Sequence, residues 1–546
     1  MKKALLFATA VSLASVLHAA DVPKAAMATN KKPEASTTAA PNKGVLFEPE
    51  SSTTEGSVTV EGKRIDYKAV AGTIVVHPKG WDDAAWREKS GNDLGDKKDA
   101  KAEASMFYVA YFKKGAPSAD RPITFLYNGG PGSSTVWLHM GAFGPRRIVT
   151  ADDSHTPAAP YRLVDNSYSL LDASDLVFID APGTGFSRIA GKDKEKAFYG
   201  VDPDAHAFGE FIKGFLSQYG RWNSPKYLFG ESYGTPRSAV VVNELETGND
   251  IDFNGVVLLS QILNFDLSAD TPALNPGSDE AYITTLPTYA ATAWYHNRLQ
   301  GERPADLGAY LKEVEQFANT DYVQALQFGS EIDPTRKQQV AEKLAHYTGL
   351  PVAYILKSNL RIDGGQFSKE LQNASGITTG RLDSRFSGPD MDPLSKEADY
   401  DPQSASISSA YVSAFNNYVR KDLRFGLNEV YKPEIDVFKD WDFNHQQPGL
   451  PFPIRGATNV MPDLASAMKY NPNLKVLVAG GYFDLATPFY EGWYEMHHLP
   501  IPAKLQDNIE YHYYPSGHMV YAHQESLKQI HDDVAAFMRR NINIGS

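Results

Sequence analysis

The chain of 546 residues contains no cysteine. Disulfide bonds therefore contribute nothing to its stability, and the hydrophobic core must supply it. The composition is sufficient for such a core, because 42% of the residues are hydrophobic and 12% are aromatic. The absence of cysteine does not argue against export, since an oxidising compartment permits disulfides without requiring them.

Cofactor motifs are missing as well. The sequence has no H-E-x-x-H helix, no Walker loop and no G-x-G-x-x-G in a convincing strand-to-helix setting. We therefore expect neither a metal nor an organic cofactor. Basic residues are fewer than acidic ones, and the net charge is -13. Because such a surface repels phosphates, nucleic acid is excluded as a partner.

The only long apolar run lies at the N-terminus. Residues 1–20 combine two lysines, an apolar stretch of about 14 residues and a small-residue end, which is typical of a secretory signal peptide. A membrane span needs about 20 apolar residues, so none is expected. Residues 21–45 have little to bury and predict a disordered leader. We expect an exported, soluble protein, periplasmic if the source is a Gram-negative bacterium.

A serine between two glycines follows the apolar run at 226–229. The motif is Gly-Glu-Ser-Tyr-Gly at 230–234. In this arrangement a sharp turn from strand to helix exposes the serine hydroxyl as a nucleophile. Glycines are needed because the turn tolerates no bulk. Ser232 is therefore the candidate nucleophile.

A glycine-rich loop, Asn-Gly-Gly-Pro-Gly-Ser-Ser at 128–134, follows another apolar run at 123–127. In α/β-hydrolases the loop after the third strand donates a backbone N–H to the oxyanion hole. An ordinary tight turn would explain one or two of these glycines, but not a Gly-Gly pair before proline at this place in the strand order. We interpret the loop as one side of an oxyanion hole.

Two turns near the C-terminus supply an acid and a base. Asp484 follows the apolar strand predicted at 474–479, and His518 follows the strand predicted at 509–514. The chain order Ser232, Asp484, His518 is the order expected of an α/β-hydrolase. Other histidines lie nearby, but only His518 is preceded by glycine in a turn directly beyond a strand.

Asp180 is the rival acid, because it also ends a predicted strand, at 175–179. It precedes Ser232, however, which is the wrong order for this fold. We therefore prefer Asp484.

Together these motifs resemble the serine carboxypeptidase family. The resemblance covers roughly residues 60–530 and includes Gly-Thr-Gly-Phe-Ser at 183–187 and Gly-His-Met at 517–519. It implies Ser232 as nucleophile, His518 as general base and Asp484 as the residue that orients the imidazole. It also implies two pairs of binding residues. Gly130 and Tyr233 would donate N–H groups to the oxyanion, and Asn128 and Glu231 would hold the C-terminal carboxylate of a peptide.

The chain departs from the family pattern in two ways. Ser133 stands where members commonly carry cysteine, and a further carboxylate-binding glutamate would fall near Ala142. Arginine suits bidentate carboxylate binding. Arg146, Arg147 and Arg237 are candidates to replace the missing glutamate, and solvated surface arginines are an equal alternative.

The spacing of the motifs predicts the domain layout. Strands and helices alternate through 121–262, which predicts a mostly parallel sheet covered by helices, as in an α/β-hydrolase fold. About 250 residues separate Ser232 from Asp484, whereas two βαβ steps need roughly 60 to 80. We expect the first part of the core at 46–267, a helical cap insertion at 268–452 and the second part of the core at 453–546.

The insertion contains helical patterns at 305–317, 336–347 and 406–419. A helical cap would wall the substrate site and help exclude water. The aromatic residues within 282–294 either line that site or form the core of the cap.

The sequence thus predicts an exported serine carboxypeptidase that acts on peptides with a free C-terminus and prefers acidic pH. An esterase or acyltransferase could use the same triad, because fold and triad do not fix the acyl acceptor. A binding protein without chemistry is the alternative from another class. The oligomeric state, the side-chain preference and the biological substrate stay open.

Overall fold

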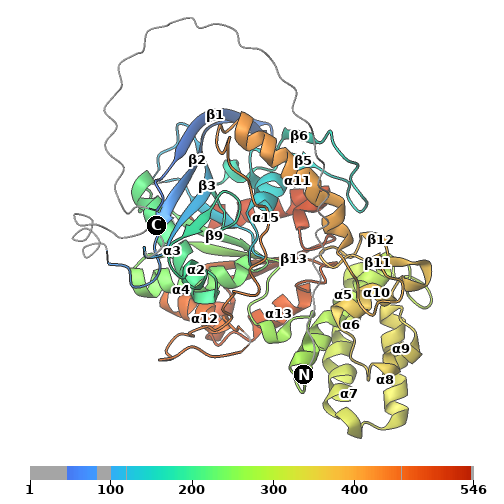
Figure 1. The fold of residues 1–546 in the computed structure, drawn as a ribbon. Helices are drawn as coiled ribbons and strands as arrows, with labels where there is room; N and C mark the ends of the chain where they lie inside the picture. The colour runs from blue at the N-terminus through green and yellow to red at the C-terminus, as the bar shows by residue number, and fades with distance from the viewer. Residues whose placement is uncertain (1–45, 83–99, 119, 457, 543–546) are drawn as a thin grey trace, which may run out of the picture. The chain divides into compact units, whose positions relative to one another are not determined.

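A mostly parallel sheet forms the centre of the fold (Figure 1). The computed structural model describes residues 46–82, 100–118, 120–456 and 458–542. The predicted signal peptide and leader therefore lie outside the described residues. Among the described residues, no helix is both long and apolar enough to cross a bilayer.

Within the described chain, the sheet has ten strands in the order β1-β2-β3-β7-β4-β9-β10-β13-β14, with β8 paired to β3. The first three strands and the β3–β7 pair are antiparallel. All pairs from β7 to β14 are parallel. This topology confirms the predicted α/β-hydrolase fold. The strands span Ser51–Val60 (β1), Lys63–Val76 (β2), Glu103–Lys113 (β3), Asp175–Ile179 (β7), Ile123–Tyr127 (β4), Lys226–Glu231 (β9), Gly255–Leu259 (β10), Lys475–Gly481 (β13), Ile509–Tyr514 (β14) and Arg188–Ala190 (β8).

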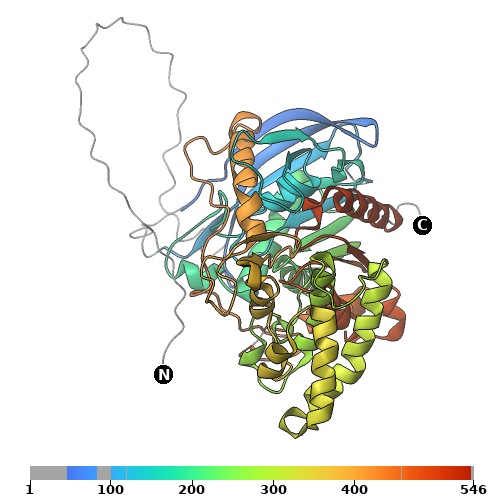
Figure 2. The same cartoon turned by 90° about the vertical axis from the view of Figure 1, so that its right-hand side faces the viewer.

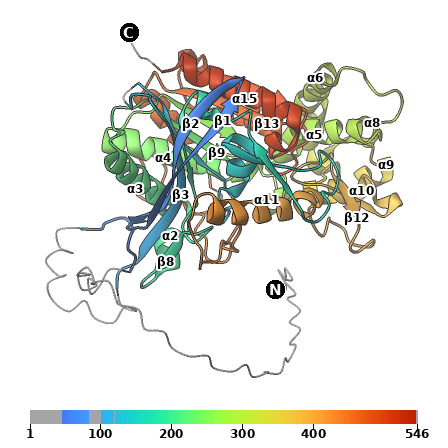
Figure 3. The ribbon, with the colours of Figure 1, turned by 90° about the horizontal axis from the view of Figure 1, so that it is seen from above.

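Helices cover both faces of the sheet, as Figure 3 shows from above. Helices α3 (Val201–Tyr219), α4 (Gly234–Asn249) and α12 (Met461–Tyr470) share one core cluster with the strands. Helices α11 (Pro402–Lys421) and α15 (Gln524–Arg540) share the other. Because parallel strands are buried on both faces, their sequences are continuously apolar rather than alternating.

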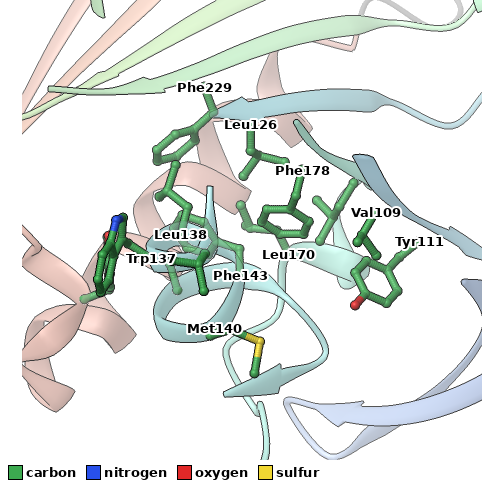
Figure 4. Close-up of a cluster of buried hydrophobic side chains, with 14 of the residues drawn as sticks. Val109, Tyr111, Leu126, Trp137, Leu138, Met140, Phe143, Leu170, Phe178 and Phe229 are labelled. Carbon is green, nitrogen blue, oxygen red and sulfur yellow. The ribbon is translucent and has the colours of Figure 1, made fainter. Parts of the chain in front are cut away.

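Side chains from neighbouring strands converge in the second cluster (Figure 4). Leu126, Phe178 and Phe229 project from β4, β7 and β9 toward Leu138 and Phe143 of the short helix η1 (Leu138–Phe143). All five are buried. At about 25 cal/mol per Å² of apolar surface, burial of such side chains is the main stabilising term in a chain without disulfides.

The predicted cap insertion divides into two parts. Helices α5 to α9 share a hydrophobic cluster that also includes residues following β13, such as Phe483 and Phe489, whereas α11 packs into the cluster that contains α15. In Figure 2, α11 is the orange helix that extends from the yellow helices toward the blue strands. The helical patterns predicted at 305–317, 336–347 and 406–419 correspond to α6, α8 and α11. The bounds are Glu280–Tyr295 (α5), Leu307–Phe317 (α6), Val323–Gln327 (α7), Pro334–Thr348 (α8), Val352–Lys357 (α9) and Gly364–Glu370 (α10).

His445 binds two core helices and so holds the long segment after α11 in place. Its Nδ1 lies 2.6 Å from Oδ1 of Asp202 at the start of α3, and its Nε2 lies 2.7 Å from Oδ2 of Asp463 in α12. Only the imidazolium can donate to both carboxylates. Burial lowers the pKa of His445, but the two aspartates outweigh it and raise the pKa to about 9.

A raised folded-state pKa implies that His445 stabilises the fold below about pH 6.5 and that this contribution is lost as the pH rises through 9. We expect His445→Gln to lower the free energy of unfolding by about 1 to 3 kcal/mol at pH 6. The difference between wild type and variant should shrink toward pH 9.5. Urea unfolding of both proteins across this range measures it, and a difference that does not change with pH would contradict this role.

Candidate active site

The turn after β9 holds Ser232 in a left-handed backbone conformation, with φ 59°. A Cβ at Gly230 would collide with the carbonyl oxygen of Gly234, and one at Gly234 would lie 2.9 Å from the carbonyl oxygen of Tyr127. The two glycines of the motif are therefore required by close backbone packing. Ser232 lines a cavity of about 890 Å³, at the end of the strand and the start of α4.

Asp484 and His518 lie beyond the ends of β13 and β14, and their side chains meet. Oδ2 of Asp484 is 2.8 Å from Nδ1 of His518. Oδ1 accepts from the backbone N–H groups of Ala486 (2.9 Å) and Thr487 (3.0 Å), and the Thr487 hydroxyl donates to Oδ2 at 2.8 Å. The carboxylate is thus fully buried, satisfied and fixed in the direction that orients the imidazole.

Several charges act on His518. Burial lowers its pKa, but the charge and hydrogen bond of Asp484 and the charge of Glu231 raise it more, while Arg381 opposes them. The net direction is upward. The site therefore stabilises an imidazolium, which a general base becomes when it removes the proton from a serine.

The glycine loop and the serine turn approach each other closely. A Cβ at Gly129 would collide with the backbone nitrogen of Tyr233, and Gly130 has a φ of 107° that favours glycine. Gly130 and Tyr233 line the same cavity as Ser232 and His518. The structure thus brings the two predicted N–H donors and the predicted nucleophile and base to one cavity.

Asp180, the rival acid, serves a different contact. Its Oδ1 accepts from the backbone N–H of Thr135 at 2.8 Å and lies 3.5 Å from the hydroxyl of Tyr431. Burial raises its pKa to about 7. His518 thus pairs with Asp484, whereas Asp180 holds the backbone at the end of the glycine loop through Thr135.

Asn128 and Glu231 form a polar group beside the nucleophile. Oδ1 of Asn128 accepts from the backbone N–H of Leu138 at 3.0 Å, and its amide is hydrogen-bonded to Glu231. The hydroxyl of Tyr521 donates to Oε2 of Glu231 at 2.8 Å. Burial raises the pKa of Glu231 to about 7, against the lowering effects of His518 and these hydrogen bonds. Both Asn128 and Glu231 line the cavity.

Tyr521 was missed at the level of sequence. It lies three residues after His518, in Gly-His-Met-Val-Tyr, and no motif distinguishes it from the other 28 tyrosines. The only available signal was its closeness to the histidine along the chain.

Two of the three arginine candidates, Arg146 and Arg237, have other partners. Arg146 pairs with Asp165 at 2.6 Å on the surface. Arg237 is wholly buried and paired with Asp204, and its Nη1 donates to the backbone carbonyl of Asn128 at 2.8 Å. Arg237 thus fixes the backbone of the glycine loop. Arg147 is half-buried, and burial lowers its pKa. Among the described residues, none of the three lines the cavity, and the arginine in its wall is Arg381.

Ala142, near which the resemblance would place a further carboxylate-binding glutamate, is buried within η1. Its backbone carbonyl accepts from the side chain of Asn166 at 2.7 Å.

The aromatic residues of 282–294 belong to the insertion's core. Tyr282 and Tyr289 are buried in the cluster of α5 to α9. Apolar side chains from other segments line the cavity, including Ile262, Phe265, Leu274, Ile435, Phe438 and Phe443.

Known proteins share parts of this sequence. Residues 95–431 match the family model described as serine carboxypeptidase. A carboxypeptidase Y homolog of Arthroderma benhamiae is 32% identical over 24% of this chain and 24% of that protein. Serine carboxypeptidase ctsa-3.2 of Caenorhabditis elegans is 26% identical over 31% of this chain and 33% of that protein. The matches to these two relatives thus span a third of their length or less.

A distant likeness is found among solved structures. Proline iminopeptidase of Mycobacterium smegmatis aligns with 90% of this chain and 100% of that chain, at 12% identity and a TM-score of 0.33.

If Ser232 is the nucleophile, a fluorophosphonate probe should label the wild type at this residue. Ser232→Ala should abolish labelling and lower kcat by roughly a factor of a million, as loss of the serine does in subtilisin. Ser408→Ala is the matched control, because Ser408 lines the same cavity. Labelling and hydrolysis that persist in the Ser232 variant would refute the assignment.

Proposed function

The chain belongs to the serine carboxypeptidase family, and we propose that it is an exported enzyme that releases C-terminal amino acids from peptides. The observation that carries the proposal is the buried, protonatable carboxyl of Glu231 with the Asn128 amide beside Ser232, in the cavity that His518 also lines. Export rests on the signal-peptide pattern of residues 1–20.

The reaction follows from the side chains that meet in the cavity. His518 removes the proton of Ser232 as the serine oxygen attacks the carbonyl carbon of the last peptide bond. The oxyanion accepts hydrogen bonds from the N–H groups of Gly130 and Tyr233, and each such donor is worth about 3 to 4 kcal/mol. The C–N bond then breaks, and His518 returns the proton to the leaving amine. Water cleaves the acyl-enzyme in the same way, which restores Ser232 and frees the shortened peptide.

Glu231 accounts for the choice of a C-terminal residue. Two ionised carboxylates cannot comfortably share a buried site, so one proton should be held between Glu231 and the C-terminus of the peptide. The side-chain amide of Asn128 can donate to the same carboxylate. Burial favours the neutral form of Glu231 up to about pH 7, so the donor is present before substrate arrives.

The first test compares peptides with free and amidated C-termini. If Asn128 and Glu231 bind the carboxylate, amidation should cost about 1.5 to 3 kcal/mol in kcat/KM, the range for a hydrogen bond to a charged group. Timed release of amino acids from matched peptides measures it. Equal turnover of both kinds of peptide would instead favour an endopeptidase or an esterase.

The second test is the pH profile. Productive binding of a free C-terminus is present while Glu231 is protonated and is lost as the pH rises through about 7. The acid limb reports protonation of His518, whose raised pKa is coupled to Glu231. We therefore expect kcat/KM for free peptides to be highest on the acidic side of neutrality and to fall above it. For substrates with a blocked C-terminus, kcat/KM should stay high to a higher pH, because they carry no carboxylate that needs a protonated Glu231.

Glu231→Gln is the matched variant, because glutamine donates a hydrogen bond at every pH. It should flatten the alkaline limb for peptides with a free C-terminus. Superimposable alkaline limbs for free and blocked substrates of the wild type would exclude a shared proton.

A further inference from the structure

A short segment of the insertion touches both of the turns that carry Asp484 and His518. Residues Gly380–Phe386, here called the brace, connect β11 (Ile377–Thr379) to β12 (Ser387–Pro389). Asp383, Ser384 and Phe386 have no exposed surface, and Arg385 is nearly buried. Residues 383–386 of the brace thus lie in the interior of the protein, whereas Arg381 at its start is exposed.

On one side the brace flanks the acid. The backbone N–H of Leu485 donates to the carbonyl of Arg381 at 3.0 Å, and the N–H of Ser384 donates to the carbonyl of Phe483 at 2.8 Å. These two hydrogen bonds lie on either side of Asp484 in the sequence and fix the turn at both ends.

On the other side the brace holds the base. The backbone N–H of His518 donates to the carbonyl of Leu382 at 2.6 Å, and the N–H of Gly517 donates to Oδ2 of Asp383 at 3.2 Å. A Cβ at Gly517 would lie within 2.5 Å of the side chain of Asp383. Glycine before the histidine is therefore required by the closeness of the brace, which adds a physical reason for the Gly-His motif.

The side chains of the brace keep it rigid. Oδ2 of Asp383 is 2.7 Å from Nη2 of Arg385, and Oδ1 accepts from the backbone N–H of Arg385 at 3.0 Å. Both residues of this ion pair are buried, and Nη1 of Arg385 also lies 3.4 Å from Oδ1 of Asp152. Loss of Arg385 would therefore leave the charge of Asp383 uncompensated.

Two anchors join the brace to neighbouring helices. The carboxylate of Asp401 accepts from the backbone N–H of Arg381 at 2.7 Å and also caps α11. The hydroxyl of Ser384 lies 2.6 Å from that of Thr292 in α5. The brace is therefore bonded to α5, which precedes it in the chain, and to the start of α11, which follows it.

We propose that Asp383 and Arg385 are positioning residues, which hold the turns of Asp484 and His518 at the separation that the contact between these two side chains requires. The two turns follow different strands, and the brace is bonded to both. A misplacement of about 1 Å at a distance from the reacting atoms can cost about 100-fold in rate. The proposal rests on the proposed function for its kinetic readout, but its geometry can be tested without activity.

The test compares Asp383→Asn with Asp390→Asn. Asp390 forms the matched buried pair, 2.8 Å from Lys369 within the same insertion, and both side chains are 2% exposed. We expect Asp383→Asn to lower kcat by about 10- to 100-fold with little change in KM. We expect Asp390→Asn to alter thermal stability without this loss of kcat.

The pKa of His518 is the second readout, measured by NMR on protein with ¹⁵N-labelled histidine and assigned with His518→Gln. The charged groups that act on His518 are Asp484, Glu231 and Arg381. Because Asp484 raises the pKa of His518, displacement of the two turns should lower it. Asp390→Asn should leave it unchanged.

Arg385→Lys separates position from charge, because it keeps the charge of the pair but loses the forked geometry. It should lower both kcat and the pKa of His518, and it decides the test if Asp383→Asn does not fold. The proposal is overturned if both brace variants match Asp390→Asn in kcat and in the pKa of His518. If the wild type neither hydrolyses peptides nor reacts with the probe, the proposed function fails, while the NMR readout still tests the brace.

Discussion

The structure depends on a strained turn at Ser232. A left-handed backbone at a residue other than glycine costs about 1 to 3 kcal/mol and persists only where its surroundings over-determine it. Here β9 lies in the middle of the parallel region, between β4 and β10. The turn is also confined by backbone contacts that only glycine allows at 129, 230 and 234. Because the strands of a parallel sheet end at one edge, the same packing that fixes the serine brings the other site loops to it.

Buried charge is used in two opposite ways around this edge. Paired charges fix the backbone: Arg237 with Asp204 holds the carbonyl of Asn128, and Asp383 with Arg385 holds the turn before His518. Glu231 instead accepts hydrogen bonds from the neutral side chains of Asn128 and Tyr521, while the charge of His518 lowers its pKa. Burial then raises its pKa to about 7. The paired charges make the backbone rigid, and the carboxyl of Glu231 can gain or lose a proton near neutral pH.

Local patterns made the fold and the motif residues predictable from the sequence. Apolar runs marked the strands at 123–127, 226–229 and 474–479, and the turns after them placed Ser232, Asp484 and the glycine loop at the sheet edge. The brace could not be predicted, because its hydrogen bonds to the two turns join residues more than 90 positions apart and follow no period. Tyr521 and Arg381 were missed for the same reason. Arg146 and Arg237, which the sequence singled out, proved to have other partners, since proximity along the chain does not show which way a side chain points.

The insertion contributes to the geometry of the catalytic residues as well as covering the site. Its helices α5 to α9 share one hydrophobic cluster with Phe483 and Leu485, the residues on either side of Asp484. Arg381 brings a guanidinium into the cavity wall, where it is paired with Asp270 at 2.5 Å and acts on His518. A surface loop can vary freely because few contacts depend on it. This insertion instead supplies part of the wall of the cavity, part of the charge around His518, and the hydrogen bonds that join the two turns. Its packing and the geometry of the site are consequently parts of one structure.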